Sequence, residues 1–289
     1  MKTLKINCNF FCSLMLLLFI SSCEKDDNSM SSTEEYLSTQ IPNDITELFI
    51  TTGSANADTV WIFEQGGPAN ELDTNSLDYL PNHNDYLNVY VHQVLTYNNA
   101  LYNKNLTVEQ AELESDVNSE ILDRVIRYYK DQGKTVIVIG HSYGASVVTK
   151  YLTDKGSDLA DKYVIMGSRL DAPQDFYKGL INSQYYYFPD FVTSTLHPTI
   201  QPKDHQENIE LLLAGVVLKP RYTEELDDVD LTKLIYVFAN DDDAVGRLSS
   251  SEKAFLASKN VRIVEIESGG HGAMFDAPNN QIIYDLMIQ

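Results

Sequence analysis

The stretch Thr135-Val136-Ile137-Val138-Ile139-Gly140-His141-Ser142-Tyr143-Gly144 joins an apolar run to the pattern Gly-x-Ser-x-Gly. Its first five residues have the length and β-branched content of a buried strand, and residues 145–155 after it are typical of a helix that ends near Gly156. A sharp turn from strand to helix requires glycine beside the serine, because the backbone passes close to its neighbours. This context predicts that Ser142 stands above the sheet edge as a nucleophile.

Strand-like and helix-like segments alternate along the rest of the chain. The predicted strands cover residues 45–51, 59–64, 88–95, 135–139, 163–166, 234–239 and 261–267. Several are continuous apolar runs, as expected of parallel strands that are buried on both faces. Helices are predicted from a capping box at Thr107 and Gln110, from periodic residues 117–130 before Gly133, and near residues 282–287. The alternation predicts an α/β fold with a mainly parallel twisted sheet and helices on both faces.

A serine hydroxyl becomes a useful nucleophile only when a base accepts its proton and an acid orients that base. Candidates for both follow predicted strands near the end of the chain. The strand at 234–239 leads into Asp241-Asp242-Asp243, and the strand at 261–267 leads into His271. These residues follow Ser142 in the order acid, then histidine.

With these residues in that order, the segment from Ile45 to Gln289, apart from an insert, resembles the α/β-hydrolase superfamily. The resemblance implies that Ser142 is the nucleophile, His271 the base and Asp242 the acid. Asp242 is preferred because the family pattern around the acid aligns its small and apolar ends with Ala239 and Val245. The nearest alternatives are Asp241 and Asp243, followed by Asp171 after the preceding strand.

The resemblance also implies an oxyanion hole, in which two N–H groups stabilise developing negative charge. The backbone N–H of Tyr143, directly after the serine, is one predicted donor. The second is the N–H of Gly67, because Gln65-Gly66-Gly67-Pro68 resembles the His-Gly-Gly-Pro turn of the family. Gln65 departs from the usual histidine, and we expect this difference to affect the support of the loop more than the donors themselves.

Residues 171–230 form the predicted insert, which contains no clear strand and is rich in tyrosine, including Tyr185-Tyr186-Tyr187. Its position before the acid-bearing strand resembles that of a lid in the family. We therefore expect a mostly helical lid that covers Ser142 and presents aromatic surface to a substrate. The alternative is that these rings only pack the insert onto the domain.

The N-terminus has the features of a processed bacterial lipoprotein. Lys2 and Lys5 precede an apolar block, and residues 1–22 are predicted to be a signal peptide. Ile20-Ser21-Ser22-Cys23 resembles a lipobox, which implies lipidation of Cys23. Residues 23–43 are predicted to be a flexible acidic tether, and residues 44–289 the hydrolase domain. The expected location is the bacterial cell envelope, on the outer membrane, with exposure at the cell surface left open.

Composition restricts the partners and the chemistry. The 289 residues contain 42 Asp and Glu against 21 Lys and Arg, which disfavours nucleic acid as a partner and leaves membrane attachment to the lipid. Cys8, Cys12 and Cys23 are the only cysteines, so the domain has no thiol for catalysis. No metal-ligand spacing connects the histidines, and three adjacent aspartates are more typical of a solvated turn than of a calcium site.

These features together predict a lipid-anchored serine hydrolase that works through an acyl-enzyme intermediate without a cofactor. We expect its substrate to be a small-molecule ester, with amides or peptides and thioesters as the next candidates. One alternative is an inactive binding lipoprotein of the same fold, in which the Ser142 hydroxyl would point away from His271. Another is cofactor-free lyase or perhydrolysis chemistry on the same residues.

Overall fold

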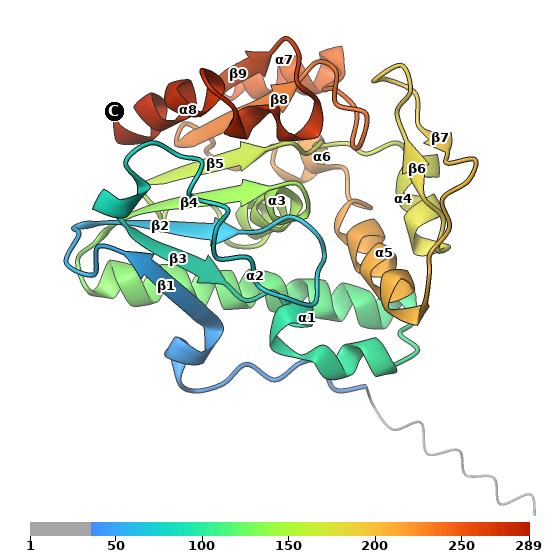
Figure 1. The fold of residues 1–289 in the computed structure, drawn as a ribbon, viewed down its shortest axis with the longest axis horizontal. Coiled ribbons are helices and arrows are strands. Elements are labelled where there is room, and N and C mark those ends of the chain that lie inside the picture. The colour runs from blue at the N-terminus through green and yellow to red at the C-terminus, as the bar shows by residue number, and fades with distance from the viewer. Residues whose placement is uncertain (1–35) are drawn as a thin grey trace, which may run out of the picture. The chain divides into compact units, whose positions relative to one another are not determined.

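A seven-stranded sheet in the order β1-β3-β2-β4-β5-β8-β9 forms the centre of the computed structural model, which describes residues 36–289 (Figure 1). Only β1 runs antiparallel to its neighbour, β3, and every other pair of neighbouring strands is parallel. The strands are β1 (Phe49–Gly53), β2 (Thr59–Glu64), β3 (Leu87–Val91), β4 (Thr135–His141), β5 (Lys162–Met166), β8 (Leu234–Ala239) and β9 (Arg262–Ile266). The predicted fold class is confirmed.

Alternate residues of the central strands face two separate cores. In β2, Val60 and Ile62 belong to the core beneath α2 (Val108–Asp131) and α3 (Tyr143–Lys155), to which α7 (Ser250–Ser258) also contributes. Trp61 and Phe63 belong to the core on the other face, which α8 (Asn279–Ile288) covers. Because successive side chains of a strand point to opposite faces, a strand buried on both sides must be apolar throughout. This explains the continuous apolar runs in the sequence.

Two predicted strands differ from the observed elements. Residues 45–48 form a short 3-10 helix rather than the start of a strand, because the Asp44 carboxylate accepts a hydrogen bond from the backbone N–H of Thr46. The third strand ends at Val91, and the helix α1 (Val94–Tyr97) follows it. Gln93 and Thr96 form a capping box there. In both places a local cap prevails over an apolar pattern that suits a strand equally well.

The predicted insert contains α4 (Gln174–Ile181), β6 (Tyr186–Tyr187), β7 (Thr195–Leu196), α5 (His205–Val217) and α6 (Tyr222–Glu225). The strands β6 and β7 are an antiparallel pair that the sequence did not predict. Phe176, Leu180, Phe188 and Leu211 form a small core within the insert. In Figure 1, α4, α5 and the β6–β7 pair lie beyond the arrowheads of β2, β4 and β5, at the sheet edge where the nucleophile is predicted.

The described chain already contacts the domain before residue 44. The hydroxyl of Tyr36 and the backbone N–H of Thr39 donate to the fully buried carboxylate of Glu114 on α2. The C-terminal part of the predicted tether is therefore packed against the domain. The predicted signal peptide and Cys23 lie outside the described residues. Within residues 36–289, every helix is too short or too polar to cross a bilayer.

Candidate active site

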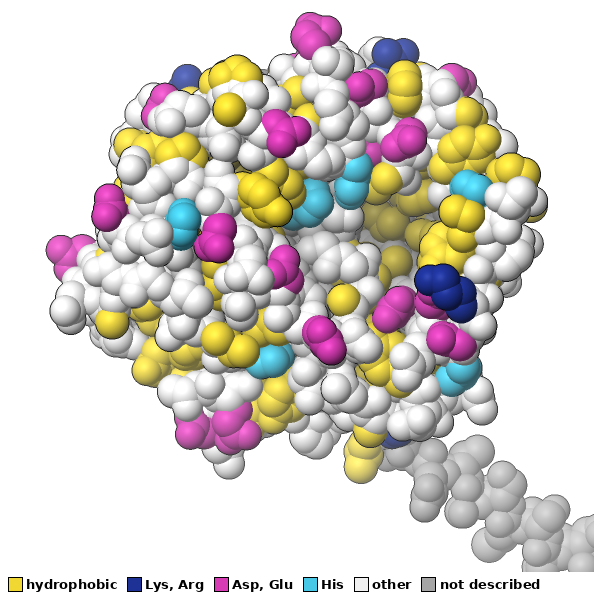
Figure 2. Space-filling view, viewed as in Figure 1, with side chains coloured by type: hydrophobic (Ala, Val, Ile, Leu, Met, Phe, Trp, Pro, Cys, Tyr) yellow, Lys and Arg dark blue, Asp and Glu magenta, His cyan; other side chains and the backbone are white. Residues whose placement is uncertain are grey.

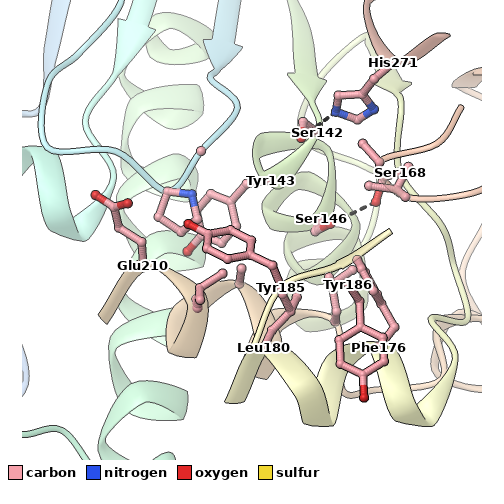
Figure 3. Close-up of a pocket in the computed structure, with 17 residues that line it drawn as sticks. Ser142, Tyr143, Ser146, Ser168, Phe176, Leu180, Tyr185, Tyr186, Glu210 and His271 are labelled. Atoms are coloured by element: carbon pink, nitrogen blue, oxygen red, sulfur yellow. Dashed lines mark hydrogen bonds between the residues drawn. The ribbon is translucent and has the colours of Figure 1, made fainter. Parts of the chain in front are cut away.

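Three side chains from three loops meet at the carboxyl end of the sheet. Ser142 follows β4, and its Oγ lies 2.9 Å from Nε2 of His271, which follows β9 (Figure 3). The other ring nitrogen of His271, Nδ1, lies 2.7 Å from Oδ2 of Asp242, which follows β8. The hydroxyl of Ser142 therefore points toward His271, whereas in an inactive binding protein we expected it to point away. A serine that donates to a histidine held by a carboxylate is equipped to attack a carbonyl carbon.

The backbone of the turn holds Ser142 in an uncommon conformation. Its φ is 55°, a region that residues other than glycine adopt only when the surrounding structure enforces it, with strain of about 1–3 kcal/mol. The enforcement comes from the close packing of the turn on β2. A side chain at Gly144 would overlap the carbonyl oxygens of Glu64 and Gln65, so only glycine fits there. Gly140 and Gly144 of the Gly-x-Ser-x-Gly pattern thus flank a serine whose backbone is strained.

The four candidate acids have distinct surroundings. Asp242 is buried, and its Oδ1 accepts the backbone N–H groups of Ala244 and Val245 while its Oδ2 faces His271. Asp241 instead accepts the N–H groups of Gly269 and Gly270, which lowers its pKa and holds the loop that carries His271.

The other two candidates do not contact His271. Asp243 is exposed at the surface. Asp171 accepts hydrogen bonds from Thr223 and pairs with Arg221, so it stabilises the N-terminus of α6. Of the four, Asp242 alone is hydrogen-bonded to the histidine among the described residues.

The predicted oxyanion residues border the same cavity as Ser142. Tyr143 is the first residue of α3, so its N–H has no acceptor within the helix. Gly67 lies in the loop after β2, and the buried side chain of Gln65 supports this loop. Its Oε1 accepts from the N–H of Asp73 at 2.6 Å, and its Nε2 donates to the carbonyl of Glu71 at 2.9 Å. Gln65, which replaces the family's usual histidine, therefore crosslinks the loop to the segment that follows it.

A buried polar group lies behind this loop. Glu64 at the end of β2 is 1% exposed, and burial raises its pKa well above the usual value. The Nε2 of Gln93 donates to Glu64 at 3.3 Å and to the carbonyl of Gln65 at 2.8 Å. The Tyr143 hydroxyl accepts from Nδ2 of Asn118 at 3.1 Å, and burial raises the pKa of this tyrosine. These buried, hydrogen-bonded groups thus hold the loop and the start of α3 in fixed positions.

His141, directly before the serine, packs beneath His271. The two rings lie 5.0 Å apart, and the ring of Phe275 lies 4.7 Å from His141 on another side. Burial, with a smaller contribution from His271, lowers the pKa of His141 to about 4. His141 is therefore neutral at physiological pH, and its ring gives His271 an uncharged support.

The cavity beside Ser142 has a volume of about 400 Å³. Figure 2 shows it as a hollow with a largely hydrophobic interior. Most of the apolar side chains in its wall come from the insert, which contributes Phe176, Leu180, Tyr185, Tyr186, Leu211, Ala214 and Leu218. Ser146 and Ser168 border it as well, and their hydroxyl oxygens lie 2.9 Å apart. A cavity of this size and lining suits a small molecule with an apolar portion.

Sequence reasoning missed several of these residues. Ser146 lies one helical turn after Ser142, a spacing that could have placed it beside the nucleophile. Glu210 lines the cavity from α5, yet nothing distinguished it from the other acids of an acidic chain. Within residues 36–289, no group of three or more His, Cys, Asp or Glu side chains is arranged to hold a metal ion.

Comparisons with known proteins agree with the observed fold. Residues 94–283, more than half of the chain, match the model of the alpha/beta hydrolase family. An alpha/beta hydrolase enzyme from a Medee basin deep-sea metagenome library has a similar structure, with a TM-score of 0.54 and 14% identity over 83% of this chain and 94% of that one. No curated protein sequence matches the chain.

A metagenome-derived lipolytic enzyme, from the pair LipS and LipT, has a TM-score of 0.51 and 10% identity, covering 83% of this chain and 94% of that one. At such identities the likeness concerns the fold alone. The match to the family model and the seven-stranded sheet lead to one conclusion: the chain belongs to the alpha/beta hydrolase family.

Proposed function

We propose that this protein is a serine hydrolase that cleaves a carboxylic ester through an acyl-enzyme intermediate. The observation that carries the proposal is the hydrogen-bonded series from Ser142 through His271 to Asp242 at the wall of an apolar cavity. Ser142 Oγ attacks the carbonyl carbon while Nε2 of His271 takes its proton. The protonated histidine then gives this proton to the leaving alkoxide. Water, activated by His271, hydrolyses the acyl-enzyme.

The N–H groups of Gly67 and Tyr143 are proposed to stabilise the oxyanion. Their support is that both residues border the cavity at Ser142 and that the start of α3 leaves its first N–H groups without helical acceptors. Loss of one such donor typically removes about 3 kcal/mol of transition-state stabilisation. The insert is proposed to act as a lid that limits the access of water, since its apolar side chains form much of the cavity wall.

An ester is preferred over an amide or thioester because the cavity wall is largely apolar and because enzymes described as lipolytic share the fold. Matched ester, anilide and thioester substrates with the same acyl group would rank these three classes. A higher kcat/KM for the anilide or thioester than for the ester would overturn this preference. It would not change the proposal that Ser142 is the nucleophile.

The direct test is labelling of the purified full chain with a fluorophosphonate, which reacts with activated serines. We expect the wild-type protein to be labelled and the Ser142→Ala and His271→Ala variants to remain unlabelled. Ser146→Ala is the matched control, because Ser146 borders the same cavity without a hydrogen bond to His271. Labelling that persists in Ser142→Ala, or a folded wild-type protein that is never labelled, would overturn the proposal.

We further propose that Cys23 is lipidated and anchors the protein to the bacterial envelope, on the outer membrane. The support is the lipobox-like sequence Ile20-Ser21-Ser22-Cys23 after an apolar block. Partition between detergent and aqueous phases tests the anchor. We expect the wild-type protein in the detergent phase and Cys23→Ser in the aqueous phase, and a wild-type protein that stays aqueous after expression in a bacterial host would contradict it. Fractionation of envelope membranes tests the location.

A further inference from the structure

The cavity beside Ser142 is chemically asymmetric. Ser142, Ser146, Ser168 and His271 line it together with apolar side chains of the insert. Of the described residues that line it, Glu210 alone is acidic and none is a lysine or arginine. Figure 3 shows Glu210 on the opposite side of Tyr143 from Ser142. A molecule bound along this cavity would meet the nucleophile at one end and a carboxylate at the other.

Glu210 is held in place by the fold. It lies on the same face of α5 as Leu211 and Ala214, which line the cavity beside it. The buried hydroxyl of Tyr102 donates to its Oε1 at 2.8 Å. Its second oxygen, Oε2, accepts no hydrogen bond from any residue in the described part of the chain. One oxygen is thus fixed by the protein, and the other is available to a ligand.

The surroundings of Glu210 favour a positively charged ligand. The side chain is half-buried, and burial raises its pKa, while the hydrogen bond from Tyr102 lowers it and the charges of Glu207 and Asp204 raise it again. Lys203 lowers it as well, but Lys203 is largely exposed and pairs with Glu207 at 3.0 Å. A carboxylate oxygen that loses water without gaining a partner is unfavourable, so an apolar ligand that covered Oε2 would leave this oxygen without a hydrogen bond. A cation would supply both the charge and the hydrogen bonds.

We propose that the substrate of this site carries a protonated amine, and that Glu210 binds this ammonium group at the end of the cavity remote from Ser142. The inference rests on the proposed function, because it assigns a substrate class to the same hydrolytic site. The ammonium would donate to Oε2 of Glu210 while apolar atoms of the substrate contact Leu211 and Ala214. The scissile carbonyl would then reach Ser142.

The test uses protection of Ser142 from the fluorophosphonate in the purified full chain. The probes are n-alkylammonium ions from propyl to octyl, each compared with the n-alkanol of the same length. We expect the best ammonium to protect at a concentration roughly ten- to hundredfold lower than its alcohol, as for a hydrogen bond to a charged group. Glu210→Gln keeps the acceptor for Tyr102 and removes the charge, so we expect it to abolish this difference.

Glu224→Gln is the matched control. It removes the same charge from the insert at an exposed side chain of α6 that does not line the cavity, so the ammonium preference should persist. Labelling of each variant without ligand shows whether it is folded. Equal protection by ammonium and alcohol in the wild-type protein, or a difference that survives in Glu210→Gln, would overturn the inference. Absence of labelling in the wild-type protein would instead overturn the proposed function.

Discussion

The loops at the sheet edge and the insert both border the cavity, yet different forces hold them. At the sheet edge, backbone hydrogen bonds hold the reacting groups: the N–H of Ser142 donates to the carbonyl of Met166, and Asp242 accepts two backbone N–H groups. In the insert, side chains pack on one another, as Phe176 does on Phe188 with ring centroids 5.1 Å apart. We infer that changes at the sheet edge affect every substrate, whereas changes in the insert affect the choice of substrate.

The largest effect is expected from the adjacent pair Asp242 and Asp241. Asp242→Asn removes the carboxylate that orients His271, and we expect kcat for an ester to fall by about 10³–10⁴. Asp241→Asn keeps an oxygen for the backbone of the histidine loop, so kcat should fall by less than about tenfold. Steady-state kinetics measures kcat of both variants, and their melting temperatures are the control for folding. Equal losses of kcat would mean that Asp242 has no special role.

Two glycine-to-alanine variants test how well each region can adjust to an added methyl group, which we call its stiffness. In Gly144→Ala the new methyl group would overlap backbone carbonyls at the end of β2, and we expect the free energy of unfolding to fall by about 3 kcal/mol. In Gly179→Ala it would overlap the ring of Tyr186, a half-buried side chain that has room to turn, so we expect a fall of about 1 kcal/mol. Urea unfolding of both variants measures the difference.

Gly272→Ala provides the reference for that pair, because a methyl group there would have no atom within 4 Å. Its unfolding free energy should stay close to that of the wild-type protein. We also expect Gly179→Ala, through the displaced ring of Tyr186, to change the relative kcat/KM of short and long esters. A smaller loss of stability in Gly144→Ala than in Gly179→Ala would contradict the contrast between the two regions.

The last prediction concerns the pH dependence of stability and the half-buried His141. Its pKa is lowered to about 4 in the folded protein, against an ordinary value of 6.5, mainly by burial. Between these values the unfolded chain binds a proton that the folded protein does not. The stabilising contribution of the neutral ring is therefore complete above pH 6.5 and is lost as pH falls towards 4, by about 3 kcal/mol.

His141→Gln removes this titration, so the difference in unfolding free energy between wild type and variant should shrink as pH falls from 7 to 4. Denaturant unfolding at several pH values measures it, and the subtraction cancels the carboxylates that both proteins share. A difference that stays constant with pH would show that His141 has an ordinary pKa in the folded protein.

The sequence predicted most of the sheet because its central strands are apolar throughout. The predicted bounds 59–64 and 234–239 coincide with β2 and β8, and the capping box of Thr107 and Gln110 is observed at the start of α2. The errors lie at 45–48 and 92–95, where caps at Asp44 and Gln93 begin short helical turns. Short apolar runs suit either structure, and at both places local capping hydrogen bonds decide between them.

By itself the sequence determined the α/β fold and the loops that carry Ser142, the aspartate run and His271, because strand periodicity and glycine spacing are local properties. Only the tertiary structure decided which aspartate faces His271, since three neighbouring carboxylates differ by where the backbone directs them. It also placed Glu210 in the cavity through the packing of α5. Contacts between residues far apart in the chain depend on how the elements pack, and no local pattern records that packing.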